Sequence, residues 1–150
     1  MDINFERISK NEFDVSNAYL LFENNSIDRS FGLLRTNEVV YKMGWQSTDI
    51  QPVVTSINEN VFSVGIDLNF VICGIKQYSI ELALGLNCFF YDSLVKGKFM
   101  YVLTELEVFR ISVENFQKIT KYSLPDYFRD INFDGDDVKI ICMDGSVING

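Results

Sequence analysis

Two glutamates stand two residues apart in an otherwise apolar stretch, and they are the first candidates for chemistry. The stretch is KFMYVLTELEVFRI, from Lys98 to Ile111, and it holds Glu105 and Glu107. Side chains two apart on one strand share a face and stand several ångströms apart, near the separation of the two glycosidase carboxylates. Catalytic carboxylates flank their substrate across a cleft, however, and these two would come from the same strand. A solvated face, or a contact surface for a cationic partner, is therefore the favoured interpretation.

A second candidate resembles the first half of a calcium-binding loop. Asp130, Asn132 and Asp134 alternate along the chain and are followed by Gly135, as in a loop whose oxygens wrap a hard cation. The twelfth position of such a loop needs a bidentate glutamate, but here it is Ile141. The same polar residues would also appear on the solvent face of a strand entering a hairpin. We therefore expect no metal and no other cofactor.

Several catalytic classes lack their usual residues in this chain. There is no histidine, which removes the commonest general base and every histidine-dependent triad or zinc site. Gly-x-Ser-x-Gly, Walker and Gly-x-Gly-x-x-Gly motifs are also absent. The three cysteines, Cys73, Cys88 and Cys142, lie in apolar strand patterns without Cys-x-x-Cys spacing, which is typical of free thiols in a reducing compartment. We expect a cytoplasmic protein that is not an enzyme.

The charge of the chain favours one class of partner over others. With 21 acidic and 13 basic residues, the net charge is −8, so a phosphate backbone would be repelled and direct nucleic-acid binding is not expected. No signal peptide and no apolar stretch long enough to span a membrane is apparent, so we expect no membrane contact. A basic protein partner fits better. Half of the negative excess lies between residues 126 and 144, where six acids face two bases: Asp126, Asp130, Asp134, Asp136, Asp137 and Asp144 against Arg129 and Lys139.

The elements that position these residues are predicted to be strands. Apolar residues alternate from Phe62 to Ile72, either as one strand or as a hairpin that turns at Asp67-Leu68-Asn69, and Asp144-Gly145 is a strong hairpin signal. The Lys98–Ile111 stretch is predicted as one long strand, with either a bulge near Thr104 or an exposed pair of carboxylates. We predict a single all-β domain over residues 1–150, mostly antiparallel, as a hairpin meander forming a sandwich or a partly open barrel. At most one or two short helical turns are expected, and Trp45 is interpreted as a lid on the core.

Three stretches of the second half carry a resemblance to a known class of proteins. They are YVLTELEVFRI (101–111), LPDYFRDINF (124–133) and VKIICMDGS (138–146). Over about residues 53–149, the chain resembles the small β-rich immunity proteins of bacterial polymorphic toxin systems, including contact-dependent growth inhibition. The resemblance implies a cytoplasmic, non-catalytic protein that binds the toxin domain of its own system and blocks its active site. Many such toxins are nucleases with basic clefts, so an acidic inhibitor can take the place of phosphates.

On this hypothesis, the contact surface combines acidic residues with aromatic anchors. The candidates are Glu105, Glu107, Asp126, Asp130, Asp134, Asp136 and Asp137, together with Tyr101, Tyr127 and Phe128. We expect the free protein to be a monomer or a weak homodimer. The alternatives are a non-catalytic ligand- or carbohydrate-binding accessory domain, with Trp45 and exposed tyrosines as stacking platforms, and a structural subunit that buries aromatic faces in a homo-oligomer.

Overall fold

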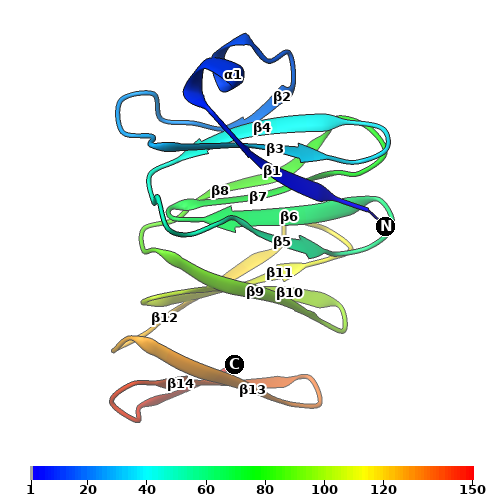
Figure 1. Cartoon of the computed structure of the whole chain (residues 1–150). Coiled ribbons are helices and arrows are strands. Elements are labelled where there is room, and N and C mark those ends of the chain that lie inside the picture. Colours follow the sequence, from blue (N-terminus) through cyan, green and yellow to red (C-terminus); the bar gives the residue numbers. More distant parts are fainter. Residues whose placement is uncertain (1) are drawn as a thin grey trace. The chain divides into compact units, whose positions relative to one another are not determined.

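The computed structural model describes residues 2–150 and confirms an all-β, mostly antiparallel architecture (Figure 1). In these residues fifteen strands form three sheets of four strands and one of three, and none of the sheets closes into a barrel. The chain divides into two compact units. Unit 1 ends at Gly85, and unit 2 runs from Leu86 to Gly150. The expectation of a single domain stays a prediction.

Unit 1 contains two four-stranded sheets and a short helix. The first sheet has the order β1-β3-β4-β2, with strands at Asn4–Ile8 (β1), Ser30–Arg35 (β3), Val40–Trp45 (β4) and Tyr19–Phe22 (β2). All of its pairs are antiparallel except β2 with β4. The second sheet is an antiparallel meander of Val53–Ser56 (β5), Val61–Ile66 (β6), Asn69–Gly74 (β7) and Ile80–Gly85 (β8). The Phe62–Ile72 alternation is therefore a hairpin, and it turns at Asp67, whose φ is 52°.

The core of unit 1 lies between these two sheets and includes the only tryptophan. Tyr41 and Trp45 of β4 share one buried cluster with Phe62 and Val64 of β6, as alternate residues on facing strands should. Trp45 is fully buried, and its indole Nε1 donates a hydrogen bond to the Ile50 carbonyl at 3.1 Å. This confirms that Trp45 belongs to the core, and its indole face offers no surface on which a ligand could stack.

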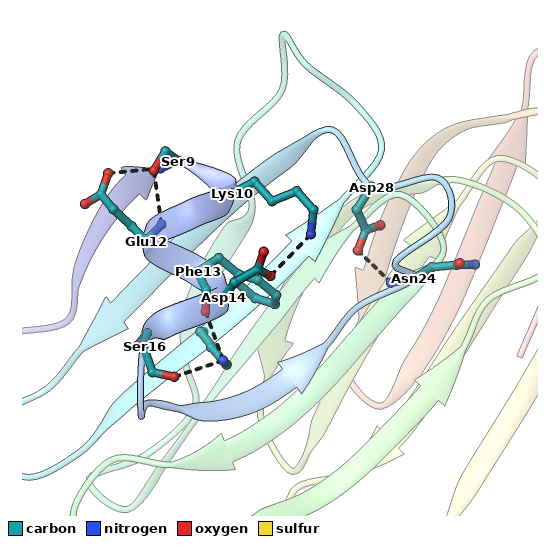
Figure 2. Close-up of polar contacts among 9 residues, drawn as sticks. Ser9, Lys10, Glu12, Phe13, Asp14, Ser16, Asn24 and Asp28 are labelled. Atoms are coloured by element: carbon teal, nitrogen blue, oxygen red, sulfur yellow. Dashed lines mark hydrogen bonds and ion pairs between the residues drawn. The ribbon is translucent and has the colours of Figure 1, made fainter.

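The helix of unit 1, α1 (Lys10–Val15), is held at both ends by side chains (Figure 2). At its N-terminus, the Ser9 hydroxyl accepts from the Glu12 amide at 3.1 Å, and the Glu12 carboxylate accepts from the Ser9 amide at 3.2 Å. At its C-terminus, Lys42 Nζ donates to the Phe13 and Ser16 carbonyls at 3.0 Å each. With six residues, α1 is the one helix among residues 2–150, and none there is long and apolar enough to cross a membrane.

Unit 2 pairs a four-stranded sheet with a three-stranded one. The first has the order β12-β11-β10-β9, with strands at Phe90–Lys96 (β9), Phe99–Thr104 (β10), Glu107–Ser112 (β11) and Ile119–Ser123 (β12). The second has the order β13-β14-β15, with strands at Phe128–Asp134 (β13), Asp137–Cys142 (β14) and Val147–Asn149 (β15). Leu103 and Val108 of the first sheet pack with Val138 and Ile140 of the second. Unit 2 is thus an antiparallel sandwich with its core between the sheets.

The prediction that Lys98–Ile111 is one long strand was wrong, because the chain reverses between β10 and β11. The Thr104 hydroxyl makes this reversal: it donates to the Glu107 carbonyl at 2.7 Å and accepts from the Glu107 amide at 3.0 Å. A threonine side chain thereby supplies the hydrogen bonds that a glycine-containing turn would make through its backbone. Glu105 and Leu106 form the tip of the turn.

Candidate functional site

The ten residues predicted to contact a partner do not form one surface, because three of them are buried. Tyr101 is 2%, Glu107 8% and Phe128 9% exposed, so the structure places them inside unit 2. Tyr101 packs against the ring of Phe133, with 5.0 Å between ring centroids. Burial raises the pKa of the Tyr101 hydroxyl, and the charge of Arg110 partly offsets this effect. Tyr101 and Phe128 therefore act as core residues, and neither offers an exposed ring as an anchor.

Glu105 and Glu107 do not form an acid/base pair, because each carboxylate has its own structural partner. Glu107 Oε2 lies 3.2 Å from Lys121 Nζ, and Glu107 Oε1 lies 4.0 Å from Cys88 Sγ. Glu105 is exposed, and its Oε1 accepts a hydrogen bond from the Phe89 amide at 3.2 Å. Glu107 thus pairs with Lys121 of the neighbouring strand β12. Glu105 instead connects the turn to the segment that precedes β9.

The calcium-like sequence lies on a strand and its hairpin. Asp130, Asn132 and Asp134 alternate along the exposed face of β13, where residues two apart are separated by roughly 7 Å. Ligands so spaced cannot converge at the roughly 2.4 Å that calcium requires. Gly135 occupies the turn with a φ of 60°. Among residues 2–150, no three histidine, cysteine, aspartate or glutamate side chains lie close enough together to hold a metal ion.

Unit 2 has two ends that differ in charge. The Glu105 end comprises the segment 86–89, the turn at 105–106, the loop 124–127 and the turn at 143–146. The Gly97 end, at the opposite ends of the same strands, comprises the turns at Gly97 and Gly135 and the loop 113–118. Backbone bonds join parts of the Glu105 end, since the Phe128 amide donates to the Glu105 carbonyl at 2.7 Å. The two sheets also meet toward the Gly97 end, where Lys96 Nζ lies 5.8 Å from the Phe133 ring.

Dividing the strands of unit 2 at their midpoints places the negative charge in one half. The half with the Glu105 end has six acids and two bases, a net charge of −4: Asp92, Glu105, Glu107, Asp126, Asp130 and Asp144 against Lys121 and Arg129. The half with the Gly97 end has four acids and five bases, a net charge of +1: Glu114, Asp134, Asp136 and Asp137 against Lys96, Lys98, Arg110, Lys118 and Lys139. The structure therefore separates Glu105 and Asp126 from Asp134, Asp136 and Asp137.

Sequence reasoning missed three exposed apolar side chains at the Glu105 end. Phe89, Tyr91 and Met143 lie at this end, as Tyr127 does, and all four are more than half exposed. The strand alternation could not reveal Tyr91, because the register between β9 and β10 shifts where Thr104 pairs with Phe90. Met143 could have been suspected from its place next to the Asp144-Gly145 turn.

Unit 1 contains a hollow of about 470 Å³ between the segment joining α1 to β2 and the turn joining β3 to β4. Tyr19, half exposed, lines it and stacks on Tyr78, with 4.2 Å between ring centroids and an interplanar angle of 5°. Arg35 also lines the hollow, and its Nε lies 3.8 Å from Glu6 Oε2. The hollow thus offers one aromatic ring and scattered polar groups.

Comparison with known proteins returns no relative from which a role could be transferred. No protein-family model matches the chain, and no curated protein sequence is similar to it.

Proposed function

We propose that this chain is an immunity protein that binds and neutralises the toxin domain of its own bacterial system, a nuclease, through an acidic surface of unit 2. It acts in the cytoplasm and has no catalytic activity of its own. The observation that carries the proposal is the excess of carboxylates that have no ionic partner. Among the ten acids of unit 2, all of which the structure describes, only Glu107 is in an ion pair; of the other nine, eight are exposed and Asp126 is half-buried.

An acidic surface can inhibit a nuclease because the cleft of a nuclease is built to hold phosphates. Carboxylates that enter such a cleft meet the same lysine and arginine side chains that would bind the nucleic-acid backbone. Complementary charge also speeds the encounter of the two proteins and disfavours partners of the wrong sign. The acids of β13 and its hairpin, Asp130, Asp134, Asp136 and Asp137, and those of the Glu105 end are the candidates for this contact.

Co-expression tests the proposal in cells. The C-terminal segment of the protein encoded immediately upstream is expressed from an inducible promoter, with and without this chain. The expected result is that the segment stops growth alone and that growth returns when the chain is present. A matched control is the chain with Phe62→Asp, which places a charge in the core of unit 1 and prevents folding. A toxic segment that the folded chain fails to counter would refute the proposal.

The stacked pair Tyr19–Tyr78 beside the hollow of unit 1 favours the alternative function, a ligand- or carbohydrate-binding domain. Aromatic rings are common platforms for flat ligand faces. Calorimetric titration with a panel of oligosaccharides tests it, with Tyr19→Ala as the matched variant. Saturable heat that the variant abolishes would support the alternative, and no heat with any sugar would count against it.

A further inference from the structure

Four large apolar side chains are exposed at the Glu105 end of unit 2. Phe89 is 52%, Tyr91 66%, Tyr127 54% and Met143 61% exposed. We call these four residues the aromatic patch. Tyrosine, phenylalanine and methionine are enriched in protein interfaces, and tyrosine is frequent among the residues that carry most of the binding energy. Single exposed apolar residues need no explanation, but a group of four at one end of a small unit does.

Backbone and ring contacts hold the aromatic patch in place. The Glu105 amide donates to the Phe89 carbonyl at 3.2 Å, and the Met143 amide donates to the Tyr127 carbonyl at 2.8 Å. The ring of Tyr91 lies 5.7 Å from the ring of Phe128, which is itself anchored in the core. A patch whose backbone is already fixed loses little conformational entropy when a partner covers it.

The charge around the aromatic patch indicates the chemistry of the partner. Glu105, Asp126 and Asp144 are chain neighbours or hydrogen-bond neighbours of patch residues, and they lie in the half of unit 2 that carries the net charge of −4. The two bases of that half are both exposed, but Lys121 is paired with Glu107, whereas Arg129 is in no ion pair with the acids of unit 2. An apolar centre with an acidic rim is complementary to a basic protein surface with an apolar spot, and it would repel nucleic acid or an acidic membrane.

We infer that the aromatic patch is the energetic centre of the interface with a basic protein domain, and that Glu105, Asp126 and Asp144 form its rim. The inference rests on the proposed function and narrows it, because it assigns the contact to the Glu105 end of unit 2. The acids of the Gly97 end, Asp134, Asp136 and Asp137, share their half of unit 2 with five bases and remain outside the interface. Patch residues govern the dissociation rate, and rim residues govern the association rate.

Surface plasmon resonance with the upstream-encoded C-terminal segment as the probe tests the inference. Tyr91→Ala and Met143→Ala are each expected to raise the dissociation rate about tenfold or more. Ile50→Ala is the matched control, because Ile50 is 55% exposed in unit 1, and its rates should equal those of the unmodified chain. Circular dichroism verifies that each variant is folded, and Met143→Ala remains informative if Tyr91→Ala loosens the contact with Phe128.

Two triple variants with equal charge change separate the two ends of unit 2. Glu105→Gln/Asp126→Asn/Asp144→Asn should lower the association rate about tenfold at low salt and weaken its salt dependence. Asp134→Asn/Asp136→Asn/Asp137→Asn should change the association rate less than about twofold, because these acids lie outside the inferred interface. A larger effect at the Gly97 end, or no effect of the patch variants, would overturn the inference while leaving the proposed function standing. Absence of binding by the unmodified chain would overturn both.

Discussion

Replacing Tyr41 with phenylalanine tests the hydrogen bonds that attach the turn between β7 and β8 to β4. The Tyr41 side chain is fully buried in unit 1, and its hydroxyl donates to the Gly74 carbonyl at 2.7 Å. The same oxygen accepts from the Ser79 amide at 3.4 Å. Removing the hydroxyl leaves these polar groups without that partner in a dry environment, so Tyr41→Phe should lower the free energy of unfolding by about 1–3 kcal/mol.

The pH dependence of the stability difference between the unmodified chain and Tyr41→Phe is the more discriminating test. Burial raises the pKa of Tyr41 to about 12, well above the ordinary value for tyrosine. Above pH 10 the unfolded chain releases the phenolic proton while the folded chain keeps it, so the contribution of Tyr41 to stability is complete below pH 10 and is lost as the pH rises toward 12. One pH unit above the unfolded pKa, the loss is about 1.3 kcal/mol, and at pH 12 it is roughly 2–3 kcal/mol.

Urea unfolding followed by Trp45 fluorescence reports on this part of the molecule, because Trp45 shares the buried cluster of Tyr41. Other groups also titrate at high pH, so the quantity of interest is the difference in unfolding free energy between the unmodified chain and Tyr41→Phe. That difference should shrink by about 1.3 kcal/mol between pH 8 and pH 11. Ser9→Ala, which removes a helix cap and no phenol, is the control and should show no such change. A constant difference for Tyr41→Phe would refute the reasoning.

Three further predictions concern the ion pair, the tryptophan and the helix. Lys121→Met leaves the buried Glu107 carboxylate, 8% exposed, without its cation and should lower the free energy of unfolding by about 1–2 kcal/mol. Adding Glu107→Gln to this variant should restore most of the lost stability, and urea unfolding followed by circular dichroism measures both effects. The emission of Trp45 should be blue-shifted, weakly quenched by acrylamide and unchanged by added sugars, because the indole is fully buried; strong quenching would contradict its place in the core. Ser9→Ala removes the N-terminal cap of α1 and should cost about 1 kcal/mol, whereas Ser9→Asp should retain most of the stability in thermal unfolding of unit 1.

The sequence was sufficient for features that depend on local pattern. Alternation between Phe62 and Ile72 located β6 and β7, and the chain turns at Asp67 and Leu68, within the three residues that the hairpin interpretation named. Asp67 is held in the turn because its carboxylate accepts hydrogen bonds from the Gln46 and Ser47 amides, at 3.0 and 2.9 Å. The position of Trp45 in the core also followed from its surroundings.

Features that depend on tertiary contacts were beyond the sequence. The reversal after Thr104 contains neither glycine nor proline, and a side-chain hydrogen bond closes it, so the stretch resembles a continuous strand. Tyr101 and Phe128 are buried because the two sheets of unit 2 face each other, and alternation alone cannot say which face of a strand meets the opposite sheet. The exposure of Tyr91 follows from a register shift that no local pattern signals.

The most direct test of the central claim mixes the purified chain with the purified toxin segment and measures the activity of the segment. The claim predicts one stable complex with nanomolar or tighter affinity, and activity that falls to background at about one molar equivalent of the chain. Full activity of the segment in a large excess of the folded chain would contradict the claim.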